Sequence, residues 1–204
     1  IDIRLLSKPG NRLFSNSTSW IVGAYRLNRE EDLMRNRTTK SQFDSELKKS
    51  SNAFYTELTT ELSTNTSITY GVRAEDWKNQ YENSSNVDSN NSEILWGGKI
   101  TLESMIALNH LAYTSLARGY KAGGVNSDPN ITEDKRTFDT ETNNTIEIGL
   151  KSSLLEDKLT TRIVTFYIQR KDQQVKNSYS YLEDGTTPSF QEYYANATEG
   201  RNYG

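Results

Sequence analysis

The residue types that most often carry chemistry are scarce in this chain. His110 is the only histidine and there is no cysteine, which excludes disulfides, thiolate metal sites and cysteine nucleophiles. A lone histidine in a strand is interpreted as structural, because a metal site needs several ligands. The carboxylate pairs Glu30-Glu31 and Glu75-Asp76 lie in polar segments and are interpreted as solvated charge.

No motif of a familiar reaction centre stands out. The chain has no G-x-S-x-G nucleophile turn, no phosphate-binding loop and no G-x-G-x-x-G dinucleotide motif. Residue counts alone leave a Ser-His-Asp arrangement open. We therefore expect that the protein is not an enzyme, and we predict no catalytic residue, no metal ligand and no cofactor.

A glycine-rich run at 118–124, RGYKAGG, is the clearest local feature. Its glycines can supply positive φ or a close backbone approach where a strand turns into a loop, so a sharp strand exit is the preferred interpretation. Basic side chains here and further on could attract an anionic ligand, although charge that faces only its surroundings explains them more simply. The predicted strand-exit residues are Gly119, Gly123 and Gly124. The candidate ligand contacts are Arg118, Tyr120, Lys121, Lys135 and Arg136.

The composition indicates a sheet with one apolar and one polar face. Only 33% of the residues are apolar, and adding the 12 glycines still leaves the chain below the roughly 45–50% of globular proteins. Disorder is the first alternative, but the apolar residues recur at every second position and there are 12 tyrosines. The net charge of −3 gives no sign of a nucleic-acid partner. No apolar stretch approaches the roughly 20 residues of a membrane helix.

Period-two alternation predicts about nine strands. In the clearest case Ile68, Tyr70 and Val72 share one face and Thr69, Gly71 and Arg73 share the other. The predicted strands cover 2–7, 19–26, 53–62, 67–77, 95–103, 107–118, 142–152, 159–171 and 191–203, with 175–182 as an extension of the eighth or a strand of its own.

The connections between these strands alternate in predicted length. Turns near 64–65 and 153–158 are short, whereas the polar segments 28–49, 79–92, 119–140 and about 177–190 are predicted to be long loops. Short turns at one end and long loops at the other are typical of outer-membrane barrels. A soluble sandwich more often has turns of similar length at both ends.

Several segments, in order, resemble the TonB-dependent outer-membrane receptors of the siderophore-receptor type. The run at 118–126 looks like the point where a strand of that family exits into an outer loop, and Tyr113-Thr114-Ser115 matches the strand before it. The family's E…N.E.G.K strand is similar to Glu141, Asn144, Glu147, Gly149 and Lys151. Further similar segments lie at 3–7, 20–25, 71–73, 166–167, 172–175, 194–197 and 203–204.

The resemblance implies an all-β, antiparallel, up-and-down transmembrane β-barrel segment. Residues 1–204 would be one part of a single barrel domain, incomplete because the family's plug domain and terminal strand are not recognised. Ile146, Ile148 and Leu150 would face lipid, and Glu147 and Lys151 would face inward. Because two sheet edges would stay open, the segment is not expected to be stable alone.

The implied function is active import of a scarce nutrient, most often a ferric siderophore, across the outer membrane of a Gram-negative bacterium. The implied partners are outer-membrane lipid, the protein's own plug domain, the TonB complex and a small-molecule chelate. Three alternatives stay open: a passive porin, a structural outer-membrane barrel, and a soluble β-rich binding or enzyme domain. The sequence does not name the ligand.

Overall fold

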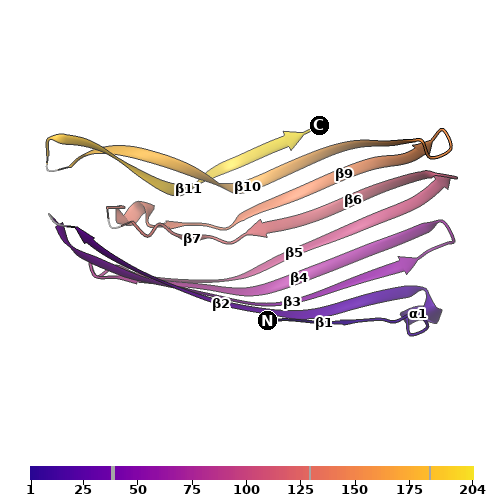
Figure 1. Ribbon diagram of the computed structural model, residues 1–204, viewed down its shortest axis with the longest axis horizontal. Helices are drawn as coiled ribbons and strands as arrows, with labels where there is room; N and C mark the ends of the chain where they lie inside the picture. Colours follow the sequence, from indigo (N-terminus) through magenta and orange to yellow (C-terminus); the bar gives the residue numbers. More distant parts are fainter. Residues whose placement is uncertain (38–39, 129, 184) are drawn as a thin grey trace.

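The described part of the chain forms a main antiparallel sheet of nine strands, which lie side by side in the order in which they occur along the chain (Figure 1). The computed structural model describes residues 1–204 except 38–39, 129 and 184. The predicted all-β, up-and-down architecture is confirmed. The strands are β1 (Asp2–Leu6), β2 (Thr18–Arg37), β3 (Lys40–Glu61), β4 (Thr66–Asn83), β5 (Asp88–Ala107), β6 (His110–Lys121), β9 (Glu141–Leu154), β10 (Leu159–Glu183) and β11 (Thr187–Tyr203).

The remaining elements are short. A two-stranded pair, β7 (Gly124–Val125) and β8 (Thr137–Phe138), lies in the connection between β6 and β9 together with the 3-10 turn η1 (Glu133–Lys135). The turn α1 (Leu13–Asn16) joins β1 to β2. Within the described residues no helix is long and apolar enough to cross a bilayer.

Three of the four predicted long loops are wrong. Strands β2 and β3 run through 28–49, β4 and β5 through most of 79–92, and β10 and β11 through most of 177–190; residues 38–39 and 184 of these segments lie outside the described part. Only the segment at 119–140 contains a long connection, at 122–140. The extra strand residues of 28–49 and 79–92 are mostly polar and show no sustained alternation, and the register shows that backbone pairing continues through them.

The two faces of the sheet differ as the alternation predicts. Directly paired residues point to the same face, so the register defines an outer and an inner face across all nine strands. On the outer face Ile148 is 56% exposed and Val72 51% exposed. On the inner face Glu147 accepts a hydrogen bond from the Tyr113 hydroxyl at 2.6 Å. Ile146 and Ile148 face outward as predicted.

The apolar part of the outer face is a band that ends partway along the strands. On β4 it runs through Ile68, Tyr70, Val72 and Ala74 and gives way to charged and amide side chains from Asp76 onward. Beyond the band, β2 to β5 continue as a polar extension, defined as residues 28–37, 40–50, 78–83 and 88–93. The described part of the chain has few buried apolar side chains, as the low apolar content requires.

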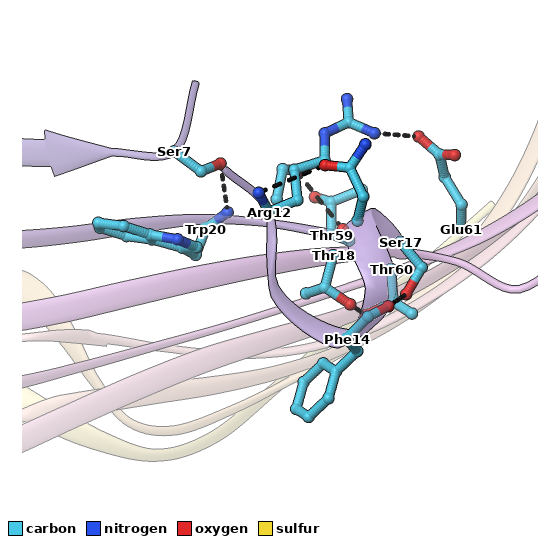
Figure 2. A network of polar contacts seen from close by, with 11 residues as sticks. Ser7, Arg12, Phe14, Ser17, Thr18, Trp20, Thr59, Thr60 and Glu61 are labelled. Carbon is cyan, nitrogen blue, oxygen red and sulfur yellow. Dashed lines mark hydrogen bonds and ion pairs between the residues drawn. The ribbon is translucent and has the colours of Figure 1, made fainter. Parts of the chain in front are cut away.

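A polar network fixes the connection between β1 and β2 at the opposite end from the polar extension (Figure 2). The Trp20 amide donates to the Ser7 hydroxyl at 3.0 Å, and Arg12 Nη1 donates to Glu61 Oε1 at 2.6 Å. Positive φ at Phe14, with the following two residues in the same region, lets the chain reverse tightly. The Phe14 ring is 73% exposed and points away from the network.

Glycines on the inner face receive aromatic rings from the neighbouring strand. A Cβ on Gly149 would lie 2.2 Å from the Tyr113 ring, and one on Gly23 would lie 2.2 Å from the Tyr55 ring. Only hydrogen leaves room for a ring that lies flat across the adjacent strand. The glycine of the E…N.E.G.K segment therefore has a packing role, because it lets Tyr113 reach Glu147.

Candidate functional site

The inner face is hollowed beside β1 to β6. A cavity of about 990 Å³ lies there, and its lining side chains include Tyr25, Tyr55, Arg73, Glu75 and Trp77. These residues are on the inner face by register, since Tyr25 and Glu75 both pair with Ala53. The hollow lies level with the end of the apolar band and the beginning of the polar extension. A ligand or a protein segment lying there would contact polar and aromatic side chains together.

Five side chains from β2, β3, β4 and β6 form one network in the hollow. Arg73 Nε donates to Glu75 Oε2 at 3.1 Å and to the Tyr120 hydroxyl at 3.1 Å. Glu75 accepts from Ser51 Oγ at 2.6 Å and from the Tyr120 hydroxyl at 2.7 Å. The Arg73 guanidinium also lies 5.2 Å from the centre of the Tyr25 ring. Every charge in this network is matched, so its geometry is set before anything binds.

The hollow is more basic than the chain as a whole. Six basic and three acidic residues line it, whereas the whole chain has a net charge of −3. Lys49 and Lys99 contribute to this excess from β3 and β5. Low-dielectric walls around a concave surface of one sign concentrate ions of the opposite sign. The hollow can therefore attract an anion.

Tyr120 reaches the inner face because β6 leaves β5 early. The pairing of these two strands ends at Gly98 and Arg118. Beyond that point the Tyr120 ring passes over Gly97, where a Cβ would be 3.3 Å from the ring, and its hydroxyl reaches β4. Simple alternation from Leu116 would have placed Tyr120 on the outer face.

The basic candidates predicted from the sequence occupy different surroundings. Arg118 donates to the Trp96 carbonyl and its guanidinium lies 4.0 Å from the Trp96 ring centre. Lys121 is exposed at the end of β6. Lys135 pairs with Asp134 at 2.5 Å and lies 5.5 Å from the Tyr179 ring centre. Arg136 is 6% exposed and donates to backbone carbonyls within its own loop. The structure does not bring these side chains together.

The three predicted exit glycines are all closely packed. None of them has positive φ; Gly10 and Gly185 are the described glycines that do. A Cβ on Gly123 would lie 2.5 Å from the Phe138 carbonyl oxygen, and one on Gly124 would lie 2.5 Å from the Phe138 ring. Gly119 is inside β6, and its amide donates to Asn143 Oδ1 at 3.1 Å. Close approach of a neighbouring strand explains all three.

Two other residues singled out by type also have defined places. His110 Nδ1 lies 2.9 Å from Ser152 Oγ, which fits the structural interpretation. The interpretation of Glu75 as solvated charge is wrong, because its side chain is 12% exposed and fully engaged. Sequence analysis missed Ser51, Arg73 and Glu75 as a group. For Arg73 and Glu75 the only signal was their position on the polar side of the predicted strand 67–77, and Ser51 lay outside every predicted strand.

Carboxylates form a row across the outer face of the polar extension. The register places Asp32, Glu46, Glu82 and Asp88 side by side on four consecutive strands. The Lys48 ammonium, 2.5 Å from Glu46, holds the pKa of the Glu46 carboxyl below its ordinary value. Hydrogen bonding to Glu46 raises the pKa of the Glu82 carboxyl. Asp32, Glu82 and Asp88 are exposed and Glu46 is half-buried. Like charges directly opposite one another weaken strand pairing.

Comparison with known proteins agrees with this architecture. Residues 7–204 match the family model described as TonB dependent receptor-like, beta-barrel. The sheet is similar to the ferric yersiniabactin uptake receptor FyuA of Yersinia pestis, with 21% identity and a TM-score of 0.68 over 88% of this chain and 30% of that one. It is also similar to the ferric-catecholate import receptor Fiu of E. coli, with 16% identity and a TM-score of 0.64 over 92% of this chain and 31% of that one.

A third solved structure gives the same picture. The alcaligin outer membrane receptor FauA of Bordetella pertussis matches with 15% identity and a TM-score of 0.64 over 99% of this chain and 33% of that one. The chain thus spans about a third of the length of the structures it matches. At these identities the structures show a common fold, and the family model covers nearly the whole sequence. The chain belongs to the TonB-dependent receptor-like β-barrel family.

Proposed function

We propose that this chain is part of the barrel wall of an outer-membrane receptor that imports a scarce nutrient with energy delivered through TonB. The nutrient proposed is a ferric siderophore. The printed descriptions of the three similar structures support this class, since two name ferric chelates and the third names alcaligin. The family membership supports TonB as the energy source.

The observation that carries the proposal is the contrast between the two faces of the sheet. The outer face has a band of exposed apolar side chains that ends where the polar extension begins, as a wall between lipid and water requires. The inner face at the same level holds a basic, aromatic hollow. A soluble sandwich would bury the apolar face against a second sheet. The proposed lipid partner is therefore the outer membrane.

Ligand contact from this chain is proposed for the hollow and its rim. Arg73 and Tyr120 lie in the hollow, and Lys121 and Lys135 are on the loop side of it. Ferric siderophores that carry acidic groups are anionic, which suits the basic excess. Arg118 and Arg136 are engaged by backbone carbonyls, so we propose for them an indirect effect on the ligand. The family's plug domain, from outside this chain, would contact other parts of the inner face.

The experiment uses the full-length protein in its own membrane. Cells with the gene and cells lacking it are grown under iron limitation with a panel of ferric siderophores. Each strain is tested with and without a functional TonB. Import that needs both the receptor and TonB supports the proposal. Uptake that continues without TonB would indicate a passive porin and would overturn it.

The ligand contact is tested by binding to the purified receptor. Tyr120→Phe with Lys99→Gln is expected to weaken affinity for the imported chelate about tenfold, because a hydrogen bond to a charged partner and one cation are lost. Lys78→Gln on the outer face is the matched control, since it removes a charge that faces away from the hollow. Equal affinities for all three proteins would remove the hollow from the binding site.

A further inference from the structure

The sheet has a gap at its polar end, called the window, where two neighbouring strands are shorter than the strands on either side of them. Strands β2 to β5 continue as the polar extension and β10 and β11 also continue, but β6 ends at Lys121 and β9 begins at Glu141. Beyond Gly98, β5 therefore has no partner on that side among the described strands. We call β2 to β5 one wall and β10 with β11 the other. The connection between β6 and β9, called the wedge and defined as residues 122–140, lies between these two walls in Figure 1. The structure describes all of the wedge except residue 129.

The wedge has an interior of its own. Asn126, Ile131 and Arg136 are 7%, 4% and 6% exposed. Arg136 Nη1 donates to the carbonyls of Asn126 and Asp128, both at 2.8 Å, and Nη2 donates to the carbonyl of Ile131. One guanidinium thus gathers three carbonyls that have no strand partner. A buried cation is tolerated here because fixed backbone dipoles surround it.

Contacts on one side join the wedge to the polar extension. The Tyr81 hydroxyl of β4 donates to the Ser127 carbonyl at 2.8 Å, and Tyr81 is 1% exposed. Thr140 Oγ1 donates to Glu93 Oε2 of β5 at 2.5 Å. These bonds reach the wedge from two strands of the same wall.

Contacts on the other side join it to β10 and β11. The Asn126 side chain accepts from the Tyr194 amide and donates to the Tyr194 carbonyl, both at 2.8 Å, which imitates a strand partner. Asn196 pairs in the same way with the amide and carbonyl of Asp139, at 2.7 and 3.0 Å. Gln174 Nε2 of β10 donates to the Ala122 carbonyl at 2.9 Å and the Asp139 carbonyl at 3.0 Å.

We propose that the wedge is a prefolded brace that fixes the distance between the two walls, and that Asn126 and Arg136 are its positioning residues. Asn126 is the centre of the arrangement because it belongs both to the interior of the wedge and to the edge of β11. Arg136 holds Asn126 and the carbonyls that follow it in place. The wedge then fixes the shape of the opening of the hollow on this side before any ligand binds. The proposal concerns the fold and does not depend on the identity of the imported nutrient.

The test measures the distance between the walls in the full-length protein in lipid nanodiscs. Spin labels at Gln80 on β4 and Ser178 on β10 report it, since both sites are exposed and outside the wedge contacts. The parent protein is expected to give one narrow distance distribution. Arg136→Gln and Asn126→Leu are expected to broaden it, and hydrogen exchange at the Tyr194 amide is expected to rise by about tenfold, because its bond to Asn126 Oδ1 is loosened or lost.

Lys135→Gln is the matched control, because it removes the same charge from the neighbouring position, where the side chain contacts Asp134 and the Tyr179 ring. The control is expected to keep the narrow distribution. Tyr81→Phe deletes one wall contact and leaves the interior of the wedge intact, so it is expected to broaden the distribution by a smaller amount. A narrow distribution in Arg136→Gln, with fast exchange confined to the wedge, would overturn the proposal and leave these residues a purely local role.

Discussion

A lysine on the outer face of β9 should separate a lipid-facing wall from a water-facing one. Ile148 is 56% exposed, pairs with Thr114 and Thr165, and lies between Ile146 and Leu150 in the apolar band. In the complete barrel its side chain would lie among acyl chains. Ile148→Lys should therefore cost about 2–4 kcal/mol if the site is near the bilayer midplane, which is about 30-fold to 700-fold in the folding equilibrium.

The assay is urea unfolding of the full-length protein in lipid vesicles, followed by tryptophan fluorescence. Thr145→Lys is the control, because Thr145 is three residues away on the inner face, paired with Ala117 and Ile168. It is expected to change stability by less than about 0.5 kcal/mol, as most substitutions at solvated positions do. Similar losses in both variants would refute the assignment of faces, and so would full stability in Ile148→Lys.

Three further predictions concern the inner face and the polar extension. Gly149→Ala should destabilise the barrel by about 1–3 kcal/mol, because the Tyr113 ring must move, whereas Gly71→Ala, whose Cβ would have its nearest neighbour at 3.5 Å, should be tolerated in the same unfolding assay. Tyr120→Phe alone should cost about 1 kcal/mol in that assay through its lost bonds to Arg73 and Glu75, and no change would contradict the network. Glu82→Gln should slow hydrogen exchange in the β3–β4 pairing at neutral pH. Because the pKa of Glu82 is raised, its ionised form opposes folding, and the contribution of Glu82 to folding stability increases as pH falls. Because the pKa of Glu46 is lowered, the stability that Glu46 contributes is lost as pH falls. Only the Glu46 loss should remain in Glu82→Gln. Protection of these amides, taken relative to the intrinsic exchange rate at each pH, that increases on acidification of this variant would contradict the assignment.

The strands inside the apolar band could be predicted because one side of each meets an apolar environment and the other a polar one. Residues 67–74 show this alternation plainly, and β4 contains them. The same rule failed for 28–49 and 79–92, where both faces meet polar surroundings and the side chains carry no periodic signal. Backbone pairing holds those strands, and backbone groups are the same in every residue.

The sequence by itself determined the fold class, the approximate number of main strands and the division of each patterned strand into two alternating faces, because these depend on period-two patterning within one strand. It also marked 118–124 as a special segment. Only the tertiary structure decided what that segment does: β6 leaves β5 at Arg118, Tyr120 crosses to Arg73 and Glu75, and the following wedge fills a window in the sheet.

The same division applies to the charged residues. Arg136 and Lys135 are neighbours of the same charge, and no local pattern distinguishes the buried one from the exposed one. Their difference comes from which carbonyls lie within reach, and those carbonyls are brought together by contacts with β4 and β11, far away in sequence. Alternation is a property of a single strand, whereas a site is a property of several strands at once, and for that reason the wall was predictable and the hollow and the wedge were not.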